Sequence, residues 1–406
     1  MTTPPSEPVT DFNLVRGGMF DRWTQRLQLD KSLRRRLLKV ALLLGVTWAP
    51  LLILSNLPGS TPNASLEVPF HHDPEVHARY LAVVPLLELA EIVVAVSLVI
   101  QTRQLRGMGL VPAGQRGQFD QAMAEAIRLR NTHWADAALF AFAFGLAISL
   151  RVFGRLSDSD SSWERPTGEL SLAGWWHAGI SLPILYFFIF RWLWIFLTWT
   201  RFLFRVSRID LQLTPTHPDR AGGLGFLGWG AAAWATVLLA ISTFFSAAFA
   251  QQILHKGESL DSLKYHVVTY LVIALLVVYS PLLSFSSRLA RCRFTGLLEF
   301  GAMVWRYDRA FEEKWMAEPA EPTGAHPVEH EKAAENPPEA FLGSADIQSL
   351  ADIATPFNHI NEMRLIPFDS KAFAVLILSA LLPMLPLLGT EIPLQEIFAK
   401  LGELVI

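Results

Sequence analysis

The sequence predicts an all-α, polytopic membrane protein, and its composition, hydropathy pattern and charge distribution each lead to this class. Hydrophobic residues make up 51% of the 406 residues, and charged residues only 17%. That balance is too apolar for a soluble chain of this length, so we expect the bilayer to be its solvent. The single cysteine, Cys292, excludes an internal disulfide framework and a Cys-rich metal site.

Six segments are long and apolar enough to cross the hydrocarbon core, which requires about 20 residues of helix. They cover roughly 37–57, 81–101, 134–153, 175–200, 224–253 and 266–287. A seventh apolar stretch at 372–390 contains Pro383 and Pro386, and it is predicted either to span with a kink or to enter and turn back. We therefore expect six to seven membrane helices.

Lys and Arg residues in the short loops predict the orientation, because cytoplasmic loops carry the excess of positive charge. The N-terminal segment and the loops after the second and fourth spans hold 16 of these residues, against five in the alternate loops. This distribution predicts a cytoplasmic N-terminus.

Four parts follow from these boundaries: a basic cytoplasmic segment at 1–36, a six-helix membrane domain at 37–287, a cytoplasmic helical region at 288–370, and a C-terminal part at 371–406. The last part is expected to be a span or re-entrant hairpin followed by an amphipathic helix. Within the third part, 317–340 is rich in Pro, Glu and Ala and is predicted to be a disordered linker, because it has little apolar surface to bury.

Apolar residues at helical spacing flank this linker on both sides. They are Phe300, Val304, Tyr307, Phe311 and Trp315 before it, and Ile347, Leu350, Phe357 and Ile360 after it, with an interruption at Pro356. Two helices are expected here, which either pack on each other or form a contact between subunits.

Five charged residues lie within the second, third and fourth predicted spans, where each costs about 2.5–3.5 kcal/mol unless it has a partner or a purpose. They are Glu88, Glu91, Asp136, Arg151 and Arg191. Glu88 and Glu91 share one helical face near the middle of the bilayer. The depth of each residue in the membrane, counted at about 1.5 Å per residue, predicts that Arg151 pairs with Glu88 and that Arg191 pairs with Asp136. Glu91 is then left without an obvious partner. We interpret the group either as ion pairs that fix helix register or as a cation or proton path.

The segment "VPFHHDPEVHARY" concentrates imidazole and carboxylate groups in the first outer loop. His71, His72, Asp73 and His77 are weak candidates for a divalent metal site, because their spacing matches no metalloenzyme template and a surface loop is the more frequent outcome. No cofactor is expected. The sequence has no phosphate-binding loop, nucleophile elbow or kinase signature, and His133 and His177 begin spans at opposite faces, where they cannot ligate one haem.

The segment "LQLTPTHPDRAGGLGFLGWG" at 211–230 forms the predicted cytoplasmic entry to the fifth span. Asp219 is placed to cap the helix that follows, and Gly222, Gly223, Gly225 and Gly228 permit close approach of another helix. The alternative is a site for a lipid phosphate or a phosphorylated ligand at the positive end of that helix. Its residues would be His217, Asp219, Arg220, Gly222 and Gly223.

The string "LTPTHPDRAGGLGFLG", together with "MRLIPFD" and "LLPMLPLL" further along the chain, resembles a family of bacterial multi-span inner-membrane proteins whose activity is uncharacterised. The resemblance implies a bacterial inner-membrane location and a shared architecture, and it assigns no role to any residue.

The preferred functional hypothesis is an oligomeric ion channel or transporter-like protein with an acidic path at the midplane. The alternative is a membrane-embedded enzyme or sensor that binds a lipid or phosphorylated ligand at the 211–230 loop, and a third is a structural partner in a larger complex. Membrane lipids and further copies of the chain are the expected partners, and nucleic acid is not.

Overall fold

The computed structural model describes residues 12–18, 22, 24, 26, 32–57, 66, 68–153, 162–166, 169–316 and 345–389. Within this part of the chain, seven helical stretches are long and apolar enough to cross a membrane, so the predicted all-α polytopic class is confirmed. They are Leu33–Ser55, Pro74–Gly107, His133–Val152, Leu172–Arg208, Gly225–His255, Ser262–Trp315 and Ser370–Leu387.

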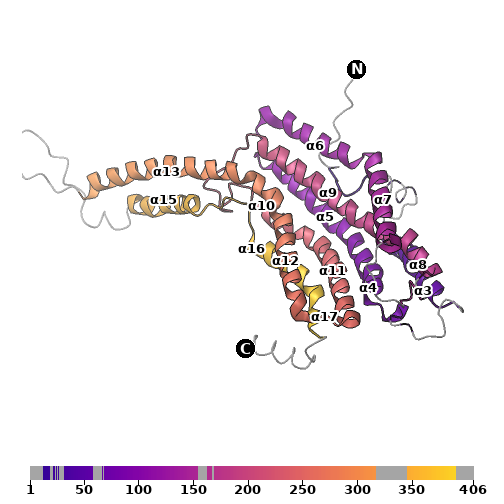
Figure 1. Cartoon of the computed structure of the whole chain (residues 1–406). Coiled ribbons are helices and arrows are strands. Elements are labelled where there is room, and N and C mark those ends of the chain that lie inside the picture. Colours follow the sequence, from indigo (N-terminus) through magenta and orange to yellow (C-terminus); the bar gives the residue numbers. More distant parts are fainter. Residues whose placement is uncertain are drawn as a thin grey trace, which may run out of the picture.

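Most stretches are made of more than one helical element. In chain order the elements of the bundle are α2 (Leu33–Thr47), α3 (Ala49–Ser55), α4 (Pro74–His77), α5 (Val84–Gly107), α6 (Arg116–Arg130), α7 (His133–Ile148), α8 (Leu172–Trp176), α9 (Leu182–Arg208), α10 (Gly225–Gly230), α11 (Ala235–Lys256), α12 (Leu260–Tyr279), α16 (Ser370–Leu381) and α17 (Leu385–Leu388). Helix α13 (Ser286–Trp315) leaves the bundle sideways, with α15 (Ala345–Asn361) beside it (Figure 1). We call the end of the bundle near the start of α13 the α13 end, and the opposite end, with α3, α4 and α8, the α4 end.

Helix α7 packs along α9 and α5 packs along α11, and small buried residues lie on these helices. Ala90 on α5, and Ala143 and Ala147 on α7, are fully buried, and such residues let backbones approach where lipid tails provide no hydrophobic drive for helix association. Part of the predicted cytoplasmic segment also enters this core. Phe12 is buried, with its ring 5.0 Å from that of Phe202 on α9.

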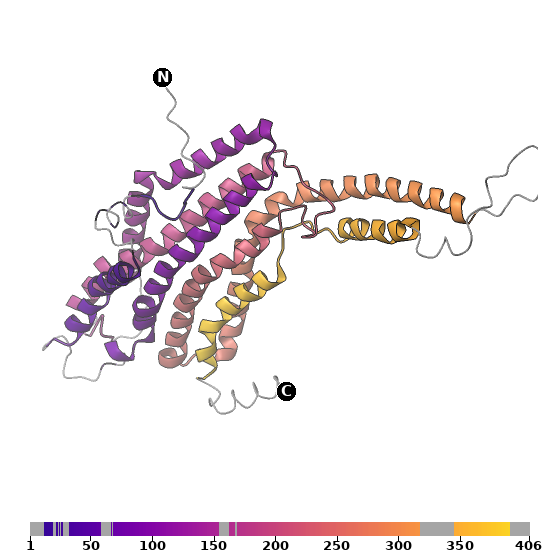
Figure 2. The ribbon, with the colours of Figure 1, turned by 180° about the vertical axis from the view of Figure 1, so that it is seen from behind.

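Helices α11, α12, α16 and α17 form the other side of the bundle, where they run side by side in both views (Figures 1 and 2). The seventh stretch continues in one direction from Ser370 to Leu388 through a 3-10 turn at Leu382–Met384. Pro383 lies in that turn, and its carbonyl accepts a hydrogen bond from Ser246 on α11. Over the described residues this stretch does not turn back (Figure 1), and the predicted C-terminal amphipathic helix lies outside them.

Helices α13 and α15 pack on each other, which is the simpler of the two expectations for this region. Tyr307 donates its hydroxyl to the carbonyl of Asp346 at 2.7 Å, and Asp346 also pairs with Lys314 and accepts from Trp315. The predicted interruption at Pro356 was wrong, because α15 continues through this residue to Asn361. The predicted linker at 317–340 lies outside the described residues.

Candidate functional site

Four ionisable side chains meet in the middle of the bundle, and we call Lys39, Glu88, Glu91 and Arg191 the midplane cluster. Nζ of Lys39 lies 2.7 Å from Oε2 of Glu88 and 3.3 Å from Oε2 of Glu91. Nη1 of Arg191 lies 3.6 Å from Oε1 of Glu91. All four residues are buried, with exposed fractions between 2% and 8%. Two cations thus neutralise two acids inside the spanning helices.

The predicted partners of these acids were wrong in two respects. Glu91 has two cationic neighbours where none was expected, and Glu88 pairs with Lys39 and not with Arg151. Lys39 escaped the sequence argument because it follows a run of basic residues at the start of the first span, where a lysine normally extends to the interface. Helix α2 exposes Leu38 and Leu42 and turns Lys39 inward.

Arg191 links the midplane cluster to the α13 end of the bundle. It donates to the carbonyl of Val15 at 3.0 Å, and it shares a small cavity with Arg130 and Asp136. Gly18 also approaches Asp136, because a Cβ placed on this glycine would lie 2.3 Å from a carboxylate oxygen. The N-terminal segment therefore closes this side of the cluster.

A second buried group lies at the α4 end, and we call Arg151, Glu164 and His177 the Glu164 cluster. Oε2 of Glu164 is 3.3 Å from Nη1 of Arg151, and Oε1 is 2.8 Å from Nδ1 of His177. Glu164 comes from the short described segment 162–166, whose neighbour Trp163 donates through Nε1 to Asp73 at 2.8 Å. Sequence analysis missed Glu164, since it stands in a polar loop with no periodic pattern.

Electrostatics hold the Glu164 carboxylate ionised. Burial opposes its ionisation, but the Arg151 guanidinium and the His177 imidazole beside it lower the pKa of Glu164 to about 2. Asp73 behaves differently, because burial raises its pKa more than the hydrogen bond from Trp163 lowers it. The Glu164 cluster therefore contains a fixed ion pair between Glu164 and Arg151. The neighbouring carboxyl of Asp73 is a weaker acid than usual.

Three π-helical turns surround the Glu164 cluster, and each carries some of its residues or their neighbours. They are Ala78–Val83, Ser149–Phe153 and His177–Ser181. Such turns are rare, are often found at functional sites, and widen the helix so that side chains shift toward a shared space. Three of the spanning stretches therefore depart from regular α-helix next to the Glu164 cluster.

Several buried polar atoms in or near the two clusters have no hydrogen-bond partner among the residues that the structure describes, as do others elsewhere in this part of the chain. Those in or near the clusters are the hydroxyl of Tyr80, Nε2 of His177, Nε of Arg79 and Oε1 of Glu88. Buried polar atoms are nearly always bonded to protein or to ordered water, so each unpaired one requires an explanation. Tyr80 and His177 are also neighbours, with ring centroids 5.9 Å apart.

The histidines of the first outer loop have structural contacts. Asp73 accepts from the backbone N–H groups of Glu75 and Val76 and so caps α4, and His77 accepts from Nε1 of Trp48 at 3.1 Å. The rings of His71 and His72 stack edge to face. Among the described residues no group of three His, Cys, Asp or Glu side chains is arranged to hold a metal ion.

The loop at 211–230 is organised by Asp219. Its carboxylate accepts from the backbone N–H groups of Ala221, Gly223 and Gly225, so it holds the turn and reaches the first residue of α10. The predicted cap was wrong in position, because the N-cap residue of α10 is Leu224, which has no side-chain cap bond. Although burial acts in the opposite direction, these bonds and His217, 2.8 Å away, hold the pKa of Asp219 below its ordinary value.

The same loop is the docking surface for the segment that precedes α16. Arg220 has a positive φ of 53°, pairs with Glu362 at 2.9 Å and accepts from the backbone N–H of Arg364 at 2.7 Å. A Cβ on Gly228 would lie 2.5 Å from the carbonyl oxygen of Pro367, so another segment does approach this glycine closely, but it is the stretch before α16 and not a helix as predicted. Gly222 approaches Met363 in the same way. The guanidinium of Arg220 is already paired with Glu362 inside the chain. Anion or lipid binding by this loop stays a prediction.

The fold and its buried clusters define a helical, membrane-embedded protein with an ionisable core. No protein-family model, curated protein or solved structure matches the chain. The functional argument therefore depends on the geometry of the two clusters.

Proposed function

We propose that this protein conducts protons across the membrane through the midplane cluster, by a relay between buried side chains and not through an open aqueous pore. One observation carries the proposal: Lys39, Glu88, Glu91 and Arg191 are buried together within spanning helices. Ionisable groups at that depth are costly and commonly mark ion or proton pathways. Because the chain encloses both acids, a relay with few water molecules fits better than the ion channel expected from the sequence.

Further polar groups extend the relay toward the α4 end. Ser181 donates to the carbonyl of Thr47 at 2.7 Å, roughly two to three turns beyond the midplane cluster. Tyr80 lies eight residues before Glu88 in the same helical stretch, a distance of about 12 Å along the helix axis. Its unpaired hydroxyl can exchange hydrogen bonds with a short file of water molecules, and the π-helical turns around it supply the structural freedom to admit them.

The same proposal places the α13 end in the cytoplasm of a bacterial cell, in the inner membrane. The excess of Lys and Arg in the loops at this end supports the orientation. The proposal also includes assembly of several copies of the chain. The exposed side chains of Phe294, Leu298 and Trp305 on the projecting α13 support this assembly.

The test is proton flux into liposomes that contain the purified protein, driven by a potassium diffusion potential and followed with a pH-sensitive dye. We expect flux in the parent protein and at least a tenfold loss in Glu91→Gln. Glu125→Gln is the matched control, because Glu125 pairs with Arg205 on the exposed side of the bundle. It should conduct like the parent.

A charge-balanced variant separates loss of the relay from loss of the fold. Lys39→Met with Glu88→Gln removes one positive and one negative charge, so no buried charge is left without its counterpart. We expect a folded protein with flux at the level of empty liposomes. Flux that is equal in the parent and in Glu91→Gln, or absent from the parent at both polarities, would refute the proposal.

A further inference from the structure

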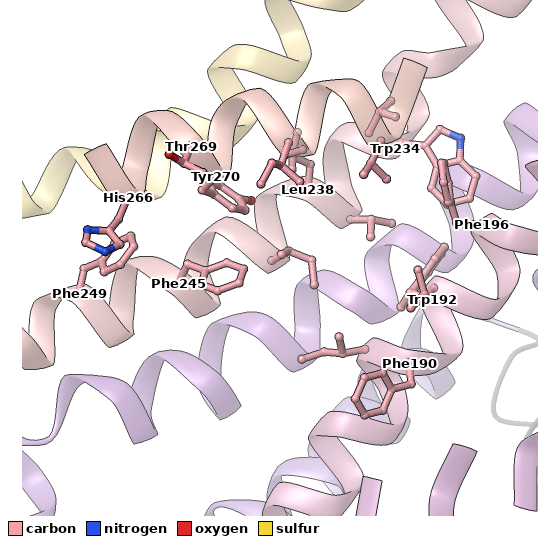
Figure 3. A pocket seen from close by; sticks show the side chains of 18 of the residues that line it. Phe190, Trp192, Phe196, Trp234, Leu238, Phe245, Phe249, His266, Thr269 and Tyr270 are labelled. Atoms are coloured by element: carbon pink, nitrogen blue, oxygen red, sulfur yellow. The ribbon is translucent and has the colours of Figure 1, made fainter. Parts of the chain in front are cut away.

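An apolar cavity of about 750 Å³ lies between α9, α11 and α12, on the opposite side of α9 from the N-terminal segment. Figure 3 shows its walls, with Trp192, Phe196 and Trp234 at one end and Phe249 and His266 at the other. All three helices belong to spanning stretches, so the cavity lies at the depth of the lipid tails.

The cavity is open to the lipid and has few polar groups. Leu193, Ile273 and Val277 line it and are between 44% and 54% exposed, so one side has no protein cover. The hydroxyl of Tyr270, which also lines it, is 2.6 Å from Oγ of Ser242 and is therefore already bonded. Helix α12 forms one wall of the cavity.

Polar side chains line the α4 end of the cavity. Tyr265, His266 and Thr269 lie in the first turns of α12, and Lys264 is next to them, with Nζ 5.5 Å from the ring centre of Tyr265. The lining then continues along α12 to Val278, about 18 Å from His266. This is slightly more than half of the hydrocarbon core, which is about 30 Å thick.

We propose that this cavity binds one acyl chain of an anionic phospholipid from the leaflet at the α4 end, with the phosphate of that lipid beside Lys264 and His266. The apolar depth matches a chain that belongs to one leaflet, and the aromatic walls hold it by contact over its length. A cation and an imidazole at the mouth match a negative head group in charge and in depth. The inference is independent of the proton relay, since no residue of the midplane cluster lines the cavity.

The test compares lipid retention by two tryptophan variants of the same helix. Ala274→Trp fills the cavity, whereas Val272→Trp adds the same side chain at a position that is 50% exposed and is not part of the lining. The full-length protein, stripped of lipid in detergent, is mixed with phosphatidylglycerol or phosphatidylcholine and examined by native mass spectrometry. We expect one retained phosphatidylglycerol per chain in the parent and in Val272→Trp, and at least tenfold weaker retention in Ala274→Trp.

Two further measurements keep the proposal open to refutation if Ala274→Trp fails to fold. Lys264→Gln should reduce the preference for phosphatidylglycerol to that for phosphatidylcholine. In the parent protein, phosphatidylglycerol with a diazirine in its acyl chain should label peptides of α9, α11 and α12 that line the cavity. Equal labelling of the exposed face of α7 would overturn the proposal. A change of oligomeric mass in Ala274→Trp without a change of retained lipid would also overturn it, and would assign the cavity to a second copy of the chain.

Discussion

The two buried clusters of the bundle solve the problem of charge in a membrane in different ways. In the Glu164 cluster one carboxylate divides its two oxygens between Arg151 and His177, so each partner has its own acceptor. In the midplane cluster Lys39 is shared by two acids, Arg191 approaches one of them only to 3.6 Å, and Oε1 of Glu88 has no bond from the described residues. The first arrangement gives each partner of the acid its own acceptor, and the second is the one on which the proposed relay depends.

The largest expected effect follows from breaking the midplane cluster at its shared cation. Lys39→Met leaves two buried acids with Arg191 alone, and removal of one partner from a buried pair costs about 3–5 kcal/mol. Thermal unfolding in detergent should show this loss in the single variant and recover most of it in Lys39→Met with Glu88→Gln. If both variants unfold like the parent, Lys39 does not hold the cluster together.

The Glu164 cluster is expected to show a somewhat smaller loss of stability on substitution, and this loss depends on pH. Because the pKa of Glu164 is lowered from 4.5 to about 2, its stabilising contribution is complete above pH 4.5 and is lost as the pH falls toward 2. Glu164→Gln should destabilise the protein by about 3 kcal/mol near neutral pH and flatten the decline in stability over that range. The measurement is unfolding between pH 2 and pH 6, and an unchanged acid profile in the variant would show that Glu164 is not the group concerned.

A smaller effect is expected where the Glu164 cluster is anchored to α4. Trp163→Phe removes the N–H that Asp73 accepts but keeps the ring contact with Phe70, 5.1 Å away. Loss of a hydrogen bond to a buried acceptor costs about 1–3 kcal/mol. Chemical unfolding should report this difference, and Leu172→Ala is a suitable control because Leu172 is 70% exposed on neighbouring α8.

The smallest effect on stability, and the most informative for the comparison, is expected at Tyr80. Its hydroxyl has no partner among the described residues, so Tyr80→Phe should change the free energy of unfolding by less than about 1 kcal/mol. If the relay passes this position, proton flux should fall several-fold while the fold is retained. Unchanged flux would confine the relay to the midplane cluster and end the functional link between the two clusters.

Much of the membrane architecture follows from the sequence through hydropathy alone. Backbone groups in hydrocarbon must bond within their own segment, so a run of about 20 apolar residues specifies a helix whatever surrounds it. The helical face shared by Glu88 and Glu91 is equally local, and both acids do meet the same lysine. The turn that Asp219 holds is also local, because its carboxylate bonds to residues only two to six positions away.

Only the tertiary structure decided which charges meet. Lys39 and Arg191 reach Glu91 from helices that are 52 and 100 residues away in sequence, and the rotation of each helix about its own axis decides whether a side chain faces a partner or lipid. Depth along a helix can be counted from the sequence, but rotation cannot, because it depends on packing by small residues such as Ala143 and on the buried N-terminal Phe12. For the same reason Glu164 acquired its role from long-range contacts, and the sequence by itself determined the spans but not the chemistry between them.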